Sequence, residues 1–256
     1  MSVSLQDVRQ YYDNNTADKL RDFVEGNARI ERAWSTIERW APKNPKNILE
    51  IGCGIGHVTA RLGERWPEAN VTGLDVSPRS LEIARTLFCA PGLTFVQGPL
   101  ARGMFDAGFD MIVLLDVYEH IACSDRPSLH VALADLLHDG SRVILSFPTP
   151  RVLVWSRKYH PLAVQPVDED VDLTTIQTLA QDIGRSILLY DEVDVWHEGD
   201  YAHAVLGTRA ELGPPVSVEV RHDLFSKICR KLGDNNSRSQ RLALVHKRLV
   251  TSVYPA

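Results

Sequence analysis

The stretch that most constrains the fold is Asn47-Ile48-Leu49-Glu50-Ile51-Gly52-Cys53-Gly54-Ile55-Gly56. A short apolar run that ends in an acid and then meets three alternate glycines predicts a buried parallel strand, a tight turn and a helix. Glycines allow positive φ angles and let a ligand lie against bare backbone. The helix that follows, predicted from about Gly56 to Trp66, would point its free N–H groups at that ligand.

The spacing of the glycines separates two classes of cofactor. A nicotinamide-binding G-x-G-x-x-G turn would have its third glycine at position 57, where this chain has His57. Cys53 and His57 would also crowd a pyrophosphate, so a nicotinamide oxidoreductase is disfavoured. The stretch E-I-G-C-G-I-G instead resembles the first motif of class I S-adenosylmethionine (SAM)-dependent methyltransferases.

The rest of the chain alternates between strand and helix patterns, which predicts a parallel sheet with helices on both faces. Strands are predicted at 46–51, 70–75, 93–97, 109–115 and 142–147, with helices at 78–88 and 126–138. Asp139-Gly140 is expected to stop the second of these helices. The runs 186–197 and 201–209 are joined by so short a connection that they must be antiparallel. Five parallel strands and such a hairpin form the seven-stranded, mixed, Rossmann-like α/β sheet that the resemblance implies.

Capping residues mark the starts of several predicted helices. Ser4 and Asp7 have the spacing of a capping box, and Asn27 is a good N-cap for a helix that runs to about residue 40. Ser77 precedes Pro78, which at the first position of a helix loses no hydrogen bond.

The predicted domain organisation has three parts: an N-terminal helical lid (1–41), a SAM-binding methyltransferase domain (42–212) and a basic C-terminal extension (213–256). Prolines make 148–172 an irregular insert, which we expect to face the substrate pocket. The resemblance implies that the lid lies over the cofactor. Tyr11, Tyr12 and Arg21 are its candidates to reach the pocket.

The cofactor site is predicted at the ends of the first strands. Asp75 closes the strand 70–75, where a carboxylate can accept both ribose hydroxyls. The resemblance implies that Glu50 reaches the methionine end through water and that Val76 flanks the adenine. The family often has an acid after the third strand, but Pro99 stands there, so Gln97 or a backbone carbonyl must accept from the adenine amino group. The implied cofactor-binding residues are Glu50, Gly52, Cys53, Gly54, Gly56, Asp75, Val76, Gln97, Gly98, Leu100, Asp116 and Val117.

The stretch after the fourth strand, 114–121, indicates which acceptor is methylated. Methylases of exocyclic base nitrogens need Pro-Pro-aromatic here and C5-cytosine enzymes need Pro-Cys, but this chain has Val117-Tyr118. Its D-x-x-E-H pattern is similar to the E-x-x-E-H of ubiquinone-biosynthesis O-methyltransferases and of many small-molecule and sugar methyltransferases. The segments 146–150, 165–169 and 200–203 also resemble bacterial small-molecule or glycan methyltransferases.

Histidines are the candidate general bases. His120 is the first choice because it follows the fourth strand and imidazole titrates near neutral pH, although it could equally wall the cofactor. His160 and His203 are the reserves, with Tyr201 as an orienting group. Asp116, Glu119 and His120 could together hold a divalent ion, but without a fourth ligand no metal is expected.

The leading hypothesis is transfer of a methyl group from SAM, leaving S-adenosylhomocysteine (SAH), to a hydroxyl in preference to an amine of a small metabolite or saccharide. One alternative is an RNA 2′-O-methyltransferase that uses the basic extension; another is a SAM-binding module without catalysis. From Pro215 onward the chain has eight Lys/Arg and three Asp/Glu, a net +5, so the rest carries −10 of the total −5. An acidic body disfavours nucleic acid as a partner. We expect the extension to pack on the body or across a dimer through Leu224, Phe225, Leu242 and Leu249.

The composition is that of a globular protein whose cysteines are kept reduced. Its four cysteines form no C-x-x-C pair, which argues against a disulfide framework or a zinc site. It contains no bilayer-length apolar run, and its N-terminus lacks the apolar segment of a signal peptide. We therefore expect a cytoplasmic monomer or homodimer with no membrane contact.

Overall fold

The computed structural model describes residues 4–161 and 164–209. Its helices are α1 (Leu5–Asn14), α2 (Thr16–Glu25), α3 (Ala28–Trp40), α4 (His57–Arg65), α5 (Pro78–Leu87), the short 3₁₀ helix η1 (Tyr118–His120), α6 (Arg126–Asp135), α7 (Pro150–Tyr159) and α8 (Leu173–Asp182). Its strands are β1 (Asn47–Ile51), β2 (Asn70–Asp75), β3 (Leu93–Gln97), β4 (Phe109–Leu115), β5 (Leu137–Pro148), β6 (Ser186–Val193) and β7 (Tyr201–Gly207).

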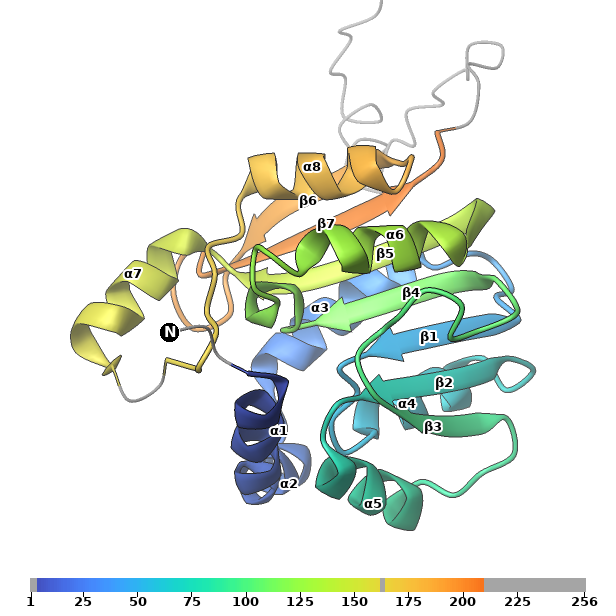
Figure 1. Cartoon of the computed structure of the whole chain (residues 1–256), viewed down its shortest axis with the longest axis horizontal. Coiled ribbons are helices and arrows are strands. Elements are labelled where there is room, and N and C mark those ends of the chain that lie inside the picture. Colours follow the sequence, from blue (N-terminus) through green and yellow to red (C-terminus); the bar gives the residue numbers. More distant parts are fainter. Residues whose placement is uncertain (1–3, 162–163, 210–256) are drawn as a thin grey trace, which may run out of the picture. The chain divides into compact units, whose positions relative to one another are not determined.

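The strands form one seven-stranded sheet in the order β3-β2-β1-β4-β5-β7-β6, with helices on both faces (Figure 1). Strands β1 to β5 are parallel, and β7 is antiparallel to both of its neighbours, which confirms the predicted fold. The strand order reverses between β1 and β4. In open α/β sheets the ligand crevice lies at the carboxyl ends of the strands beside such a reversal.

The core has two parts, one on each face of the sheet, and β4 contributes to both. Ile112 and Leu114 pack in the cluster that includes α6 and α8. Met111, Val113 and Leu115 pack on the opposite face with α3 and α4. A central parallel strand is buried on both sides, which explains why β4 is an almost continuous apolar run.

Local capping explains where several helices begin. Ser4 and Asp7 form the predicted capping box of α1, and the Asn27 side chain accepts from a backbone N–H at the start of α3. Ser77 caps α5, and Pro78 takes its first position. The lid contains one helix more than these signals indicated, because the chain breaks between α1 and α2 at Asn15.

The prediction that α6 runs to His138 and is stopped by Asp139-Gly140 is wrong. Helix α6 ends at Asp135 and β5 already begins at Leu137. The pairing of β5 with β4 shifts register between Leu137 and Arg142, which makes a bulge there. The Asp-Gly pair therefore lies inside an irregular strand, where extra residues can be accommodated.

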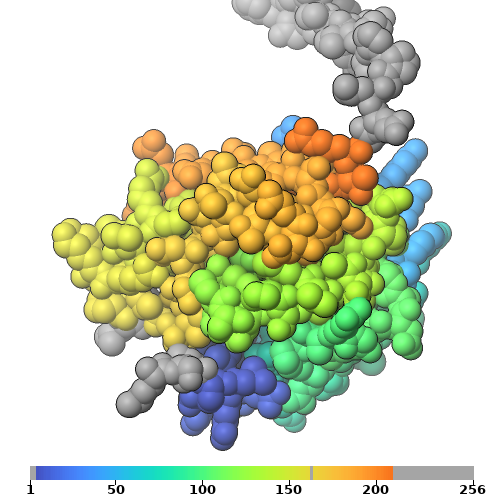
Figure 2. Space-filling model, turned by 45° about the horizontal axis from the view of Figure 1, so that its top comes forward, coloured from blue at the N-terminus to red at the C-terminus, as the bar shows by residue number. Residues whose placement is uncertain are grey.

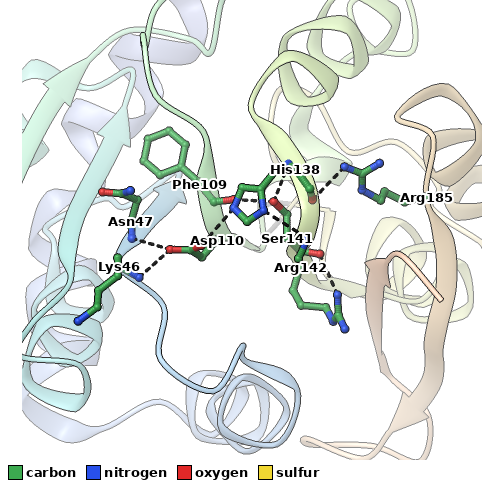
Figure 3. A network of polar contacts seen from close by, with 9 residues as sticks. Lys46, Asn47, Phe109, Asp110, His138, Ser141, Arg142 and Arg185 are labelled. Carbon is green, nitrogen blue, oxygen red and sulfur yellow. Dashed lines mark hydrogen bonds and ion pairs between the residues drawn. The ribbon is translucent and has the colours of Figure 1, made fainter. Parts of the chain in front are cut away.

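Side chains stabilise this bulge from three segments (Figure 3). One oxygen of Asp110 accepts from the backbone N–H groups of Lys46 and Asn47 at 2.6 and 2.9 Å, and the other lies 3.1 Å from His138 Nε2. Ser141 Oγ accepts from the His138 N–H at 2.9 Å and donates to a β4 carbonyl at 2.7 Å. The network lies at the start of β4, the end remote from the predicted ligand crevice, and is structural.

The prediction of an irregular insert is wrong over residues 150–159, which form α7. Pro150 occupies the first position of this helix, where its missing N–H costs nothing. Figure 2 shows α7 continuing the face that α6 and α8 make. The described residues 164–172, which precede α8, form no helix or strand.

The predicted C-terminal extension, with the apolar residues expected to dock it, lies outside the described residues. Among the residues that are described, no helix is both long enough and apolar enough to cross a membrane.

Candidate functional site

The glycine turn lies between β1 and α4, and its backbone angles and close neighbours exclude side chains at Gly52 and Gly56. Gly52 and Gly56 have φ angles of +74° and +81°. A Cβ on Gly52 would lie 2.3 Å from Val117 Cγ2, and one on Gly56 would lie 2.7 Å from the Phe95 ring. The turn is therefore packed directly against Val117, which follows β4, and against Phe95 of β3. Neither glycine could be replaced by a larger residue without displacing these side chains.

Asp75 is fixed at the end of β2, where the ribose contact is predicted. Its Oδ2 accepts from the Gly54 N–H at 2.7 Å and its Oδ1 from the Ser77 N–H at 2.8 Å. The side chain is buried. Each carboxylate oxygen can accept two hydrogen bonds, so both oxygens keep capacity for a pair of hydroxyls.

Two further groups lie beneath the turn. Glu50 is buried and accepts from the Thr59 hydroxyl, and burial raises its pKa to about 7. Burial also raises the pKa of the Cys53 thiol. The neutral Cys53 thiol lines the site, whereas Glu50 would ionise when a cation binds nearby.

Asp116 follows β4 in a strained backbone conformation. Its φ is +55°, and among the described residues no other non-glycine has a positive φ. Its N–H donates to the Ser146 carbonyl at 2.9 Å, and its Oδ2 lies 3.4 Å from Arg29 Nε. Arg29 in turn donates from Nη1 to the Tyr201 hydroxyl over 3.5 Å. Asp116 Oδ1 and Arg29 Nε are buried without a hydrogen-bond partner, and such strain and unused capacity are typical of functional sites.

His203 and Tyr201 extend this group along β7. His203 Nδ1 lies 2.8 Å from Thr36 Oγ1, and its Nε2 is buried without a partner. Ser146, the register partner of His203 on β5, also has an unpartnered hydroxyl. Burial lowers the pKa of His203 and raises the pKa of the Tyr201 phenol. Both side chains are therefore neutral at pH 7, and the imidazole can accept a proton.

His120 lies close to the same strand ends but is held differently. Its Nδ1 is 2.8 Å from the Val167 carbonyl and 3.0 Å from Asp168 Oδ1. Burial alone would lower the pKa of His120, but the Glu119 carboxylate and the hydrogen bonds to Asp168 and Val167 raise it to about 9. The imidazole is then protonated at neutral pH and has no free lone pair.

Glu119 is a buried acid with unused capacity. Its side chain is 1% exposed and its Oε2 has no partner. Burial raises its pKa to about 7. Like Glu50, it would ionise more readily beside a bound cation.

Helices α1 and α2 cover the glycine turn. The Tyr12 hydroxyl donates to Gln165 Oε1 at 3.0 Å, and Asp13 accepts from the Ser77 hydroxyl at 2.5 Å. Lys19 lies with its ammonium 4.8 Å from the centre of the Tyr12 ring and over the backbone of the turn. The lid is thereby attached to the loop after β2 and to the segment before α8.

Two candidates from the sequence lie elsewhere. Arg21 pairs with Asp18 at 2.7 Å on the exposed side of α2, so it does not reach the pocket. His160 is exposed and lies 4.8 Å, centre to centre, from the Trp155 ring of α7. Neither residue contacts the group around Asp116, and the prediction of His160 as a reserve base finds no support in this placement.

The residues at the end of β3 and the candidate metal ligands lie apart from the contacts that were considered for them. Gln97 is exposed, and the Gly98 N–H donates to the Asp75 carbonyl at 2.9 Å. Among the residues described, no group of three His, Cys, Asp or Glu side chains could hold a metal ion. Asp116 instead faces Arg29, and His120 faces Asp168.

Sequence reasoning missed the contribution of α3. Arg29 and Thr36 lie seven positions apart, which puts them on one face of a helix, and both reach polar atoms at the ends of β4 and β7. The sequence offered one signal for this contribution: Arg29 and Thr36 are polar residues on the face of the helix that also carries buried Ala33 and Ile37.

The comparisons with known proteins agree with this geometry. Residues 48–140 match the family described as "Methyltransferase domain". The trans-aconitate 2-methyltransferase of Escherichia coli (strain SE11) is 28% identical over 54% of this chain and 57% of its own length. The malonyl-[acyl-carrier protein] O-methyltransferase of Acetivibrio thermocellus is 31% identical over 28% of this chain and 25% of its own length. The matched part of this chain therefore spans 57% of the length of the first relative and 25% of the length of the second.

Solved structures share the fold. A SAM-dependent methyltransferase from Anabaena variabilis has a TM-score of 0.61 at 18% identity and covers 81% of this chain and 96% of its own. Magnesium protoporphyrin IX methyltransferase from Synechocystis with bound SAH has a TM-score of 0.58 at 20% identity, covering 80% of this chain and all of its own. Residues 48–140 therefore match a methyltransferase domain, and the two solved structures, at 18% and 20% identity, share the fold of this chain.

Proposed function

We propose that this protein transfers a methyl group from SAM to a hydroxyl oxygen of a small metabolite or saccharide. The observation that supports it is an excess of carboxyl groups around the glycine turn and the end of β4. Four carboxyl groups lie there: Glu50, Asp75, Asp116 and Glu119. They outnumber the cations described beside them, which are Arg29, Lys19 and the protonated His120, whose Nε2 lies 3.6 Å from Glu119 Oε1. Such a surplus favours a cationic ligand and opposes a pyrophosphate.

The residues present fit SAM. Asp75 would accept from the ribose hydroxyls, and the backbone at Gly52 and Gly54 would contact the methionine end. When bound, SAM supplies an activated sulfonium methyl group. The chain itself must then bind the acceptor, align its oxygen and exclude water. Alignment of this kind can supply about 7–11 kcal/mol of the barrier.

The acceptor oxygen is best served by His203. A general base must be neutral and have a free nitrogen, and His203 has both properties while His120 is protonated and engaged with Asp168. Tyr201 would donate to the acceptor and Arg29 would hold its orientation. We therefore place His203 ahead of His120 as the base, whose contribution is typically about 10²–10⁴-fold.

A second candidate is methyl transfer to a carboxylate. It is favoured by the Arg29 guanidinium, whose Nε makes an ion pair of 3.4 Å with Asp116 but no hydrogen bond and could donate to a carboxylate oxygen. It is also favoured by the relatives named for trans-aconitate and malonyl-[acyl-carrier protein]. A carboxylate is already anionic and needs no base. Activity that survives in His203→Gln but collapses in Arg29→Gln would favour this candidate over the hydroxyl.

The cofactor assignment is tested by titration calorimetry of the full chain with SAM, SAH and NAD. We expect SAM and SAH to bind and NAD not to bind. Because burial raises the pKa values of Glu50 and Glu119 to about 7, a bound cation should displace protons from them at pH 7. Repeating the SAM titration in buffers of different ionisation enthalpy measures that release, and uptake of protons would contradict the carboxylate argument.

The acceptor class is tested by a methyl-transfer screen over phenols, saccharides, carboxylic acids and RNA. Transfer to RNA that is lost on deleting 215–256 and falls steeply with salt would replace the proposal by the RNA 2′-O-methyltransferase. SAM binding with no transfer to any acceptor would leave a SAM-binding module.

A further inference from the structure

The lid helices α1 and α2 cover the glycine turn with almost no buried residues of their own. No residue of α1 is buried, and in α2 only Thr16 is buried. Isolated helices of about ten residues are marginal in water, so the position of the lid depends on individual contacts with the rest of the chain. Phe23 meets Phe88 edge-on at 5.6 Å between ring centres. Hydrogen bonds at Ser77 and Gln165 hold α1.

The hydrogen bond at Gln165 depends on a loop that one carboxylate closes. Asp168 Oδ2 accepts from the Gln165 N–H at 2.8 Å, which closes the segment 165–168. The side chain of the same Gln165 accepts from the Tyr12 hydroxyl of α1 at 3.0 Å. Arg157 of α7 donates to the Asp168 carbonyl at 2.6 Å, so the loop is also held from outside. The place at which α1 is fastened is therefore set by Asp168.

The second oxygen of this carboxylate reaches the residues after β4. Asp168 Oδ1 lies 3.0 Å from His120 Nδ1, and the Asp168 side chain is only 7% exposed. The next residue, Glu169, donates its N–H to the Glu119 carbonyl at 2.8 Å. The rings of Tyr12 and His120 lie 6.4 Å apart, edge to face. The loop 165–168 thus contacts the lid on one side and η1 on the other.

We infer that Asp168 is a positioning residue that fixes the lid and His120 together. Its Oδ2 holds the loop to which α1 is fastened, and its Oδ1 holds the imidazole of η1. Among the described residues, no hydrogen bond joins Asp168 to α1 itself, so its effect on the lid passes through Gln165. The inference rests on the proposed function, because the lid that it fixes covers the turn assigned to SAM.

The experiment is amide hydrogen exchange of the full chain, read by mass spectrometry on peptides from α1 and α8. We expect Asp168→Ala to speed exchange in α1 about 2- to 10-fold, the worth of one hydrogen bond. Tyr12→Phe should have the same effect. The double variant should exchange no faster than either single one, because both changes break the same attachment. Exchange in α8 should stay unchanged, which separates local release of the lid from a general loss of stability.

Two further variants control the measurement. Asp168→Asn keeps an acceptor for the Gln165 N–H, so it should restore most of the protection of α1 that Asp168→Ala loses. Arg21→Gln breaks a pair with Asp18 on the exposed side of α2 and should leave exchange in α1 unchanged. The release rate of SAH, measured by stopped-flow displacement with excess SAM, should rise in Asp168→Ala and Tyr12→Phe and return toward the parent value in Asp168→Asn.

Unchanged exchange of α1 in Asp168→Ala would overturn the inference. So would additive effects in the double variant, equal acceleration in α1 and α8, or a parent α1 that exchanges as fast as an unstructured peptide. Calorimetry with SAH on the same samples separates this inference from the proposed function. A loosened α1 without SAH binding refutes the cofactor and supports the positioning role, whereas SAH binding with an unchanged α1 refutes the positioning role alone.

Discussion

The attachment of His120 to Asp168 makes a pH-dependent contribution to stability that can be calculated from the structure. In the folded chain its pKa is about 9 against an ordinary 6.5. One pKa unit corresponds to 1.36 kcal/mol, so the shift is worth about 3 kcal/mol at low pH. Because the folded pKa is the higher one, this stability is lost as the pH rises through 9. Below about pH 7 it rests on Asp168 and the Val167 carbonyl, because Glu119, whose pKa is about 7, takes up a proton there.

The direct assay is an NMR titration of the His120 ring in the parent chain and in Asp168→Asn. We expect the parent pKa to lie well above 6.5 and the variant to bring it down, because the substitution removes one of the two carboxylates that favour the imidazolium. Urea denaturation of the parent and His120→Gln between pH 6 and pH 10 measures the linked stability. The difference between the two proteins should shrink as the pH rises.

A His120 that titrates at or below 6.5 would refute this reasoning. It would mean that burial outweighs the carboxylates, that the imidazole is neutral at pH 7, and that His120 is again the first choice for the base. An unchanged pKa in Asp168→Asn would show that the 3.0 Å contact has no energetic weight.

Three further substitutions test the site and the core. Asp75→Ala should weaken SAM binding by more than about 1.5 kcal/mol, the lower range for a hydrogen bond to a charged group, and unchanged calorimetric affinity would remove the ribose assignment. Gly52→Ala should cost about 1–3 kcal/mol in urea denaturation because its Cβ would overlap Val117. Gly103→Ala, also at positive φ but in open space, is the control that isolates the overlap. Tyr118→Phe removes the hydroxyl 2.7 Å from His130 Nε2 and leaves that buried nitrogen without a partner, while His130 Nδ1 keeps Asp182. It should cost about 1–3 kcal/mol by the same measurement.

The features that could be predicted from the sequence are those set by neighbours along the chain. The apolar run of β4, the cap at Ser77 and the turn after Glu50 are local patterns, and each lies where it was expected. Because these elements lie where they were predicted, Asp75 and Asp116 also lie at the expected strand ends, near the glycine turn.

The features that could not be predicted depend on contacts between distant segments. The bulge in β5 is stable because Asp110 reaches His138 from another strand, and no local pattern reports that pair. The protonation of His120 depends on Asp168, forty-eight positions away in the chain. The role of Arg29 depends on the angle at which α3 crosses the ends of β4 and β7, which is a tertiary property.

Gly26 joins α2 to α3 with a φ of +87° and nothing within 4 Å of the position where a Cβ would stand. It separates the lid helices, which cover the glycine turn, from the helix that carries Arg29 to Asp116. A rotation at this one residue would lift α1 and α2 while α3 stays packed on the sheet. The contact between Arg29 and Asp116 would then persist whether or not α1 and α2 cover the glycine turn.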